Sequence, residues 1–251
     1  FCPEDLQLIK GSPSGRRRFL DMEISQTSAT YYHQLLQYNR LLQQRNTLLK
    51  EYRGKQNIPL AEWDVQLADM AAFIVKKRME SLKKINLLID LMNRKLTGGL
   101  ENLTIGYEQP YGEEGHMVYT KEAFYDLLQE ALPQDRHRMT TSVGPHRDDL
   151  RFFSDAMDLK KFGSQGQQRT AVLSLKLSEL EFIKSEVGEY PVLLLDDVLS
   201  ELDESRRANL LQFIHKRIQT FITTTDIHDF KDLKLVQFIS CEGGKVQYGQ
   251  P

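Results

Sequence analysis

The chain has 251 residues, of which 40% are hydrophobic and 27% are charged, and its formal net charge is −2. This composition is typical of a globular protein with one large or two ordinary domains, and it excludes nucleic-acid binding driven by overall positive charge. No run of about 18 apolar residues exists, so no membrane contact through a spanning helix is expected. Two cysteines without a CxxC pair argue against a disulfide framework and favour a reducing cytoplasm.

Residues 1–27 begin with FCPEDLQLIKG, which lacks the basic and apolar regions of a signal peptide. The segment is typical of a strand, and together with the missing Met it suggests a fragment of a longer protein. A turn at residues 12–15 then precedes a predicted helix that starts with Arg16, Arg17 and Arg18. These arginines form either a solvated basic turn or a contact with DNA phosphates.

Residues 28–98 are predicted to form two helices. In the first, apolar residues recur three and four positions apart, and Arg45 occupies one slot of that stripe. RGKQNIP (53–59) interrupts the pattern, and a longer stripe follows over residues 63–96, with a one-residue slip at Ile74 and Val75. Gly98 and Gly99 are expected to end it.

At a rise of about 1.5 Å per residue, the second helix would be about 50 Å long. We expect the two helices to form an antiparallel, coiled-coil-like hairpin that projects as an arm and presents a surface to a partner. A packed helical subdomain is the alternative.

Residues 99–251 alternate between predicted strands and helices. NLTIGYE (102–108) and GHMVYT (115–120) are typical of short strands, and KEAFYDLLQEAL (121–132) is typical of an amphipathic helix ended by Pro133. Later, the apolar segment at 192–195 and the strand-like TFITTTD (220–226) flank a helical pattern. This alternation predicts an α/β fold with a parallel sheet that is covered on both faces.

A dense charged cluster follows the turn at Gly144 and Pro145. It consists of His146, Arg147, Asp148 and Asp149. We favour a salt-bridged loop for this cluster, with a metal or catalytic site as the alternative.

Asp196 and Asp197 end the most apolar predicted strand. Ligands bind at the carboxyl ends of strands in open α/β sheets, and alternation along the strand should point the two side chains in different directions. Adjacent carboxylates repel each other unless a cation neutralises them, and Mg²⁺ with a phosphate is the natural partner. A strand that ends in a polar turn is the alternative.

GSQGQQR (163–169) opens a long predicted helix. Gly163 and Gly166 allow close backbone approach, Ser164 offers a hydroxyl, and a helix that begins near Gln167 directs its positive end toward the loop. The pattern indicates an anion site in outline, or an ordinary helix start with Ser164 or Gln165 near the cap. Asp203, in LSELDESRR (199–207), is likewise typical of a helix cap.

The order of these motifs resembles the C-terminal half of ABC-type ATPases of the SMC branch, and more closely the RecF family of bacterial DNA replication and repair proteins. The segments that carry this resemblance span nearly the whole chain: FCPEDLQLIKGSP (1–13), RRRFLD (16–21), GPHRDDL (144–150), FGSQGQQRT (162–170) and LLLDDVLSELD (193–203). The resemblance implies an ATPase head that includes residues 1–27, an inserted arm at 28–98, and a head lobe at 99–251 with signature, Walker B and D-loop motifs.

The resemblance also implies a function. RecF proteins are ATP-dependent DNA-binding proteins that dimerise on ATP and help load RecA at gapped DNA, or at single-strand to double-strand junctions, with RecO and RecR. Carried over by motif, Ser164, Gln165, Gly166 and Gln167 would contact the ATP of a partner copy. Asp196 would position Mg²⁺, and Asp203 would lie at the dimer interface. Asp197 stands where most ABC ATPases have a glutamate that orients the attacking water, which fits a slow ATPase.

The chain departs from the family pattern in three places. No G-x-x-x-x-G-K-[ST] motif occurs, so the chain alone is not expected to bind ATP tightly. The glutamine of the Q-loop is not evident, since Pro3 or Glu4 falls near its position, and His228 lies slightly beyond the position of the switch histidine. An SMC-type or other repair ATPase, and a non-catalytic fragment whose arm binds a protein, are the alternatives. An arm of about 70 residues is short for an SMC tether.

Overall fold

The computed structural model describes residues 3–52, 59–99, 101–112, 115–225, 230 and 236–249. The described chain divides into two compact units, residues 3–191 and the residues from 192 onward. None of the described helices is both long and apolar enough to cross a membrane. The predicted α/β class is confirmed, because the chain combines many helices with antiparallel and parallel strand pairs.

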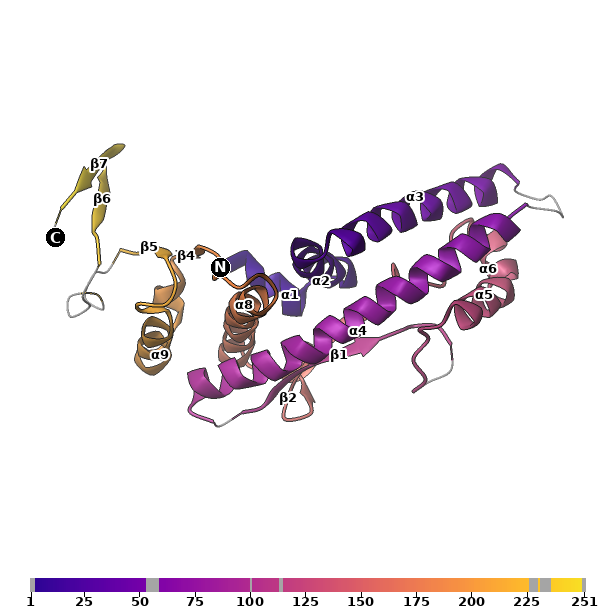
Figure 1. Ribbon diagram of the computed structural model, residues 1–251. Helices are drawn as coiled ribbons and strands as arrows, with labels where there is room; N and C mark the ends of the chain where they lie inside the picture. The colour runs from indigo at the N-terminus through magenta and orange to yellow at the C-terminus, as the bar shows by residue number, and fades with distance from the viewer. Residues whose placement is uncertain are drawn as a thin grey trace. The chain divides into compact units, whose positions relative to one another are not determined.

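The first unit is mainly helical (Figure 1). Its helices are the 3-10 helix η1 (Pro3–Leu6), α1 (Gln7–Lys10), α2 (Pro13–Thr27), α3 (Ala29–Glu51), α4 (Ala61–Thr97), α5 (Lys121–Glu130), α6 (Leu132–Arg138), α7 (Leu159–Phe162) and α8 (Gln165–Val187). Its strands are β1 (Leu103–Glu108), β2 (Asp149–Ser154) and β3 (Met157–Asp158), which form an antiparallel sheet in the order β1-β2-β3.

Two strand predictions in this unit are wrong. The N-terminal segment forms helical turns, η1 and α1, and buries Ile9. The segment 115–120 is not a strand: the side-chain amide of Gln109 accepts from the N–H of Val118 at 2.6 Å and donates to its carbonyl at 2.9 Å. A side chain therefore satisfies the backbone that a neighbouring strand would otherwise pair.

Helices α3 and α4 form the predicted hairpin, and Figure 1 shows α4 running through the first unit with α3 on one side and β1 on the other. Gly98 has a left-handed backbone (φ 67°) at the end of α4, as expected for a C-terminal cap. Ile74 and Val75 are both fully buried, so α4 continues unbroken through the slip in its apolar stripe.

The C-terminal half of α4 packs on β1 and α8. The Asn86 amide accepts from the N–H of Ile105 at 2.7 Å and donates to its carbonyl at 2.9 Å, and Asp90 accepts from the N–H of Leu103. Polar side chains of α4 thus close the free edge of β1. Because the hairpin and residues 101–191 form one compact unit, the boundary between arm and head at residue 98 stays a prediction.

The second unit contains β4 (Leu193–Asp196), the 3-10 helix η2 (Val198–Glu201), α9 (Glu204–Ile214), β5 (Thr220–Thr223), β6 (Ile239–Glu242) and β7 (Lys245–Tyr248). β4 and β5 are parallel, as predicted, with Asp196 opposite Thr223, and β6 and β7 form an antiparallel hairpin. Leu193 and Leu195 are buried, whereas Leu194 is 62% exposed. Within the described residues, this strand pair is therefore covered on one face only.

Candidate functional site

The loop before α8 presents an exposed helix N-terminus. Ser164 is the N-cap: its Oγ accepts from the N–H of Gln167 at 3.2 Å, and the Gln167 side chain accepts from the Ser164 N–H at 3.0 Å. This capping box begins the helix at Gln165, two residues earlier than predicted. In the described part of the chain, the N–H groups of Gln165 and Gly166 have no protein acceptor. They are the donors that an anion would meet.

The two glycines of this loop have different roles. A Cβ at Gly163 would lie 2.7 Å from the carbonyl oxygen of Leu159, so Gly163 is required by close packing on α7. A Cβ at Gly166 would have nothing within 4 Å. Gly166 therefore leaves open space beside the helix N-terminus, where a ligand could approach the backbone.

Asp196 and Asp197 lie at the carboxyl end of β4, and both are exposed. The hydroxyl of Thr223, on β5, donates to Asp196 Oδ1 at 2.5 Å. The strand ends at Asp196, and Asp197 has a left-handed backbone (φ 50°) whose N–H donates to the Thr223 hydroxyl at 3.1 Å. The prediction that strand alternation separates the two side chains is therefore wrong. A left-handed turn at Asp197 separates them instead.

The surroundings of Asp196 fit Mg²⁺, which commonly binds one or two carboxylates together with water and phosphate oxygens. An exposed carboxylate beside a hydroxyl supplies oxygen ligands of this kind. No group of three or more His, Cys, Asp and Glu side chains that could hold a metal occurs among the described residues. A metal at this strand end would therefore depend on water and phosphate for most of its ligands.

Asp203 is the N-cap of α9. Its carboxylate accepts from the backbone N–H of Arg206 at 2.9 Å and from the Arg206 guanidinium at 2.6 Å. The backbone hydrogen bond from Arg206 lowers the pKa of this exposed carboxyl group. The capping alternative is confirmed, and a role at a dimer interface stays a prediction. Ser164 to Gln167 lie in the first unit, whereas Asp196, Asp197 and Asp203 lie in the second. His228 lies outside the described residues.

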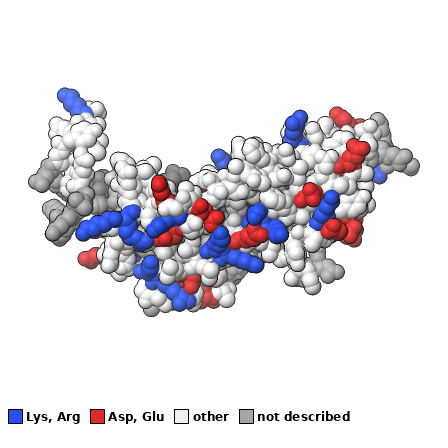
Figure 2. All heavy atoms as spheres, viewed as in Figure 1, with Lys and Arg blue, Asp and Glu red and all other residues white. Residues whose placement is uncertain are grey.

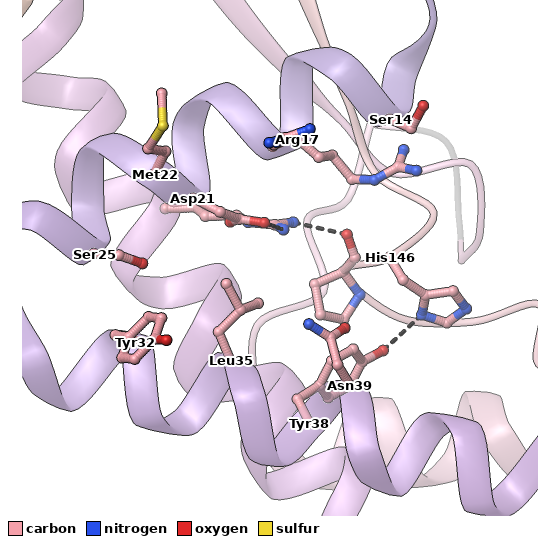
Figure 3. A pocket seen from close by; sticks show the side chains of 13 residues that line it. Ser14, Arg17, Asp21, Met22, Ser25, Tyr32, Leu35, Tyr38, Asn39 and His146 are labelled. Atoms are coloured by element: carbon pink, nitrogen blue, oxygen red, sulfur yellow. Dashed lines mark hydrogen bonds and ion pairs between the residues drawn. The ribbon is translucent and has the colours of Figure 1, made fainter.

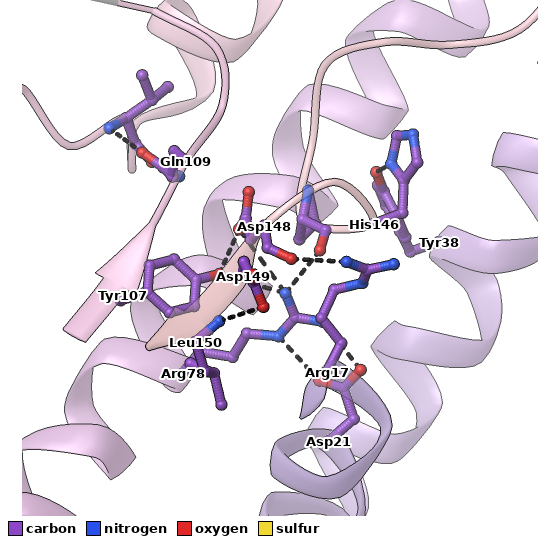
Figure 4. Close-up of polar contacts among 12 residues, drawn as sticks. Arg17, Asp21, Tyr38, Arg78, Tyr107, Gln109, His146, Asp148, Asp149 and Leu150 are labelled. Atoms are coloured by element: carbon purple, nitrogen blue, oxygen red, sulfur yellow. Dashed lines mark hydrogen bonds and ion pairs between the residues drawn. The ribbon is translucent and has the colours of Figure 1, made fainter. Parts of the chain in front are cut away.

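The charged cluster at 146–149 forms the predicted salt-bridged loop (Figure 4). Arg78, on α4, pairs with both carboxylate oxygens of Asp21, at 2.8 and 2.9 Å, and donates to the carbonyl of Pro145 at 2.7 Å. Asp148 is fully buried and accepts from the hydroxyls of Tyr107 and Tyr111. Burial raises the pKa of Asp148 to about 6, although Arg78 and the two phenols oppose this.

His146 is held in the neutral form. A carbonyl can only accept, so Nε2 donates to the carbonyl of Thr141 (3.1 Å), and Nδ1 accepts from the hydroxyl of Tyr38 at 2.6 Å. Burial lowers the pKa of His146 to about 4. Gly144 is required beside this pair, because its φ is 128° and a Cβ would lie 2.4 Å from the Tyr38 hydroxyl.

The three arginines predicted to contact DNA differ in exposure. Arg16 is 3% exposed, pairs with both oxygens of Asp149 at 2.7 and 2.9 Å, and donates to the carbonyl of Gly11. Because its guanidinium is buried and bound by these partners, it is not accessible to a phosphate. The prediction of a DNA contact is therefore wrong for Arg16, which stabilises the fold instead. Arg17 is partly buried and Arg18 is exposed, so these two stay candidates. On the face in Figure 2, basic and acidic side chains are intermixed.

Arg45 is the residue that interrupts the apolar stripe of α3. It is fully buried and pairs with Asp64 at 2.6 Å and with Asp135 at 2.7 Å, which joins α3 to α4 and α6. Thr141 also accepts from its guanidinium at 2.9 Å. The sequence signal was the arginine itself, because a charged residue in a core position must find partners.

Comparison with known proteins decides the family. No family model matches. The DNA replication and repair protein RecF of Alkaliphilus oremlandii is 51% identical over 93% of this chain and 64% of its own length. RecF of Halalkalibacterium halodurans is 45% identical over 98% of this chain and 68% of its own length. The chain belongs to the RecF family.

Solved structures agree with the family. The recombination mediator protein RecF in its ATP complex matches with a TM-score of 0.86 and 38% identity, over 99% of this chain and 67% of that one. The Smc head domain of Pyrococcus furiosus, 13% identical with a TM-score of 0.51 over 98% of this chain and 60% of that one, shows the same fold. The chain spans about two thirds of the length of the RecF relatives it matches, and 64% of the first two.

Proposed function

We propose that the chain is the larger part of an ATP-dependent, DNA-binding repair protein that dimerises on ATP and acts with RecO and RecR to load RecA at gapped DNA. The observation that carries this proposal is the exposed N-terminus of α8, where Ser164 and two unpaired backbone N–H groups face solvent in a RecF-family chain. The ATP complex of a RecF relative, 38% identical to this chain, supports nucleotide binding.

In this proposal, residues 1–27 and 99–251 belong to the ATPase head and residues 28–98 form its arm. Ser164, Gln165, Gly166 and Gln167 meet the terminal phosphate of a nucleotide that a second copy holds. The amides of Gln165 and Gly166 and the positive end of a 23-residue helix favour negative charge at that point.

The second unit contributes the acidic groups. Asp196 holds Mg²⁺ through its carboxylate, with Thr223 orienting that carboxylate by a hydrogen bond. When bound, Mg²⁺ neutralises phosphate charge. Asp197, set by its left-handed turn, orients the water that attacks, and Asp203 lies at the dimer interface. A carboxylate one methylene shorter than glutamate fits a weak ATPase that serves as a switch.

The test is ATP-dependent dimerisation of a form extended to the full length of the RecF relatives. Ser164→Arg places a cation and a long side chain where the partner's phosphate should be approached by a small hydroxyl. Ser28→Arg is the matched control, because Ser28 caps α3 in the same way, with its side chain accepting from the N–H of Tyr31 at 3.3 Å. Each variant loses one helix cap, which costs about 1 kcal/mol.

We expect Ser28→Arg to dimerise with ATP and Ser164→Arg to remain monomeric, as measured by light scattering on a sizing column. Both variants should unfold in urea at similar concentrations. Dimerisation of Ser164→Arg at the wild-type ATP concentration would refute the shared nucleotide site.

A further inference from the structure

A cavity of about 470 Å³ lies between α2, α3 and the turn that carries His146. Figure 3 shows α2 and α3 as its opposite walls, with Arg17 and Met22 on the first and Tyr32, Leu35 and Asn39 on the second. None of the residues assigned above to nucleotide, Mg²⁺ or the dimer interface lines this cavity.

The cavity has an excess of positive charge. Arg17, Arg18 and Arg78 line it with one acidic residue, Asp21, and His146 is neutral at pH 7. Arg78 is fully engaged by Asp21 and a carbonyl. Behind the cavity wall, the charge of Arg16 is balanced by Asp149, and the buried Asp148 adds a negative charge beside Arg78. The cavity and its wall together still carry one positive charge in excess.

Arg17 is held in place by a backbone carbonyl rather than by an ion pair. Its guanidinium donates to the backbone carbonyl of Asp148 at 2.6 Å, and no ion pair of Arg17 or Arg18 is present in the described part of the chain. Burial and the neighbouring Arg78 lower the pKa of Arg17. An anion in the cavity would favour the charged form of Arg17 and so oppose both effects on its pKa. It would pair with a guanidinium that is already oriented.

The other side chains fit a phosphate rather than a carboxylate. A phosphate presents more acceptor oxygens than a carboxylate, and the cavity offers two arginine forks together with the hydroxyl of Ser14, one turn earlier on α2, and the amide of Asn39. Tyr32 and Leu35 add an apolar wall on which a sugar or base could rest.

We propose that this cavity binds a phosphate group through Arg17 and Arg18. The phosphate belongs either to the backbone of a nucleic acid or to a free nucleotide, and in the first case the inference rests on the proposed DNA-binding function. The arginine side chains, Ser14 on the preceding turn of α2 and Asn39 supply the hydrogen bonds, and the contacts are independent of base sequence.

The test measures phosphate binding to the chain itself. Inorganic phosphate, ADP and a short single-stranded oligonucleotide are titrated separately at constant ionic strength, and the backbone N–H signals of α2 and α3, together with the arginine Nε–H signals, are followed by NMR. The variants are Arg18→Gln and the double change Arg17→Gln with Arg18→Gln. Arg138→Gln is the control, because Arg138 lies on α6 and outside the cavity. Arg18 is exposed, so its single variant tests the cavity even if the double variant fails to fold.

We expect inorganic phosphate to shift the signals of Arg17 and Arg18, with roughly tenfold weaker binding for Arg18→Gln and no detectable binding for the double variant. A parallel loss of oligonucleotide affinity, with a salt dependence reduced by about one unit for each arginine, identifies a nucleic-acid backbone. A loss confined to ADP and phosphate identifies a free nucleotide. Absence of phosphate-dependent shifts, or wild-type affinity in the variants, overturns the proposal. Phosphate binding without any DNA binding would instead count against the proposed function alone.

Discussion

Replacement of His146 by Gln should change how the stability of the protein depends on pH. In the folded state the neutral imidazole satisfies both ring nitrogens, with Nε2 donating to Thr141 and Nδ1 accepting from Tyr38. Burial lowers the folded pKa to about 4, against the ordinary value of 6.5 for an exposed histidine. The unfolded chain therefore binds a proton between pH 6.5 and pH 4 that the folded chain does not.

The sign follows from proton linkage: stability rises with pH wherever the unfolded state binds more protons. His146 thus costs nothing above pH 6.5, and its penalty grows as pH falls toward 4. Between pH 7 and pH 5 the difference is about 1.5 pKa units, or about 2 kcal/mol, and water at the exposed edge of the ring reduces this to about 1–2 kcal/mol.

Asp148 acts in the opposite direction. Its folded pKa of about 6 lies above the ordinary value of 3.8, so the folded state binds the extra proton. Its contribution to stability is greatest at low pH and is lost as pH rises through 6. In the wild type the two groups partly cancel between pH 5 and pH 7. In His146→Gln, the pH dependence of the free energy of unfolding should therefore show the contribution of Asp148 without that of the histidine.

The assay is urea unfolding of wild type and His146→Gln at pH 7 and pH 5. The variant should lose stability at pH 7, because hydrogen bonds are lost, but its deficit relative to wild type should shrink at pH 5 by about 1–2 kcal/mol. His137→Gln, on the exposed face of α6, is the control and should keep a constant difference. An equal deficit of His146→Gln at both pH values would refute the view that His146 is kept neutral.

Three further substitutions test the packing around the site. Arg45→Met should lower the free energy of unfolding by about 3–5 kcal/mol in urea titrations, because two buried carboxylates lose their partner, whereas the exposed Arg40→Met should change it little. Gly163→Ala should cost about 1–3 kcal/mol by calorimetry through a clash with backbone, but Gly166→Ala should be neutral or stabilising by up to about 1 kcal/mol; equal costs would contradict the packing described here. Asp203→Ala should cost about 1 kcal/mol through loss of the α9 cap, and an unchanged unfolding curve would exclude that role.

Several elements were predictable because local rules decide them. The apolar stripes of α3 and α4 fixed two long helices, Gly98 marked the end of the second, and Ser164 followed by Gln167 is the pattern of a capping box. The parallel pairing of the segments at 193–196 and 220–223 followed from apolar strands that flank a helix. The family resemblance rested on the same motifs.

Other features depended on partners distant in sequence. GHMVYT alternates like a strand, but the Gln109 side chain takes the hydrogen bonds that strand pairing would need. Three consecutive arginines are equivalent in sequence, yet the rotation of α2 buries Arg16 against Asp149 and leaves Arg18 exposed. Asp197 leaves the strand because its backbone turns left-handed beside Thr223, which lies 26 residues away.

The sequence by itself determined the long helices, the parallel strand pair, a helix cap at Ser164 or Gln165 and the family, since periodicity, capping and motif order are properties of neighbouring residues. Only the tertiary structure decided which charges are used inside the protein and which face a ligand. The guanidinium groups of Arg16, Arg45 and Arg78 are buried and paired with carboxylates inside the protein, whereas Arg17 and Arg18 line an open cavity. The physical reason is that a buried charge requires a partner, and the chain supplies that partner from more than fifty residues away for Arg16 and Arg78.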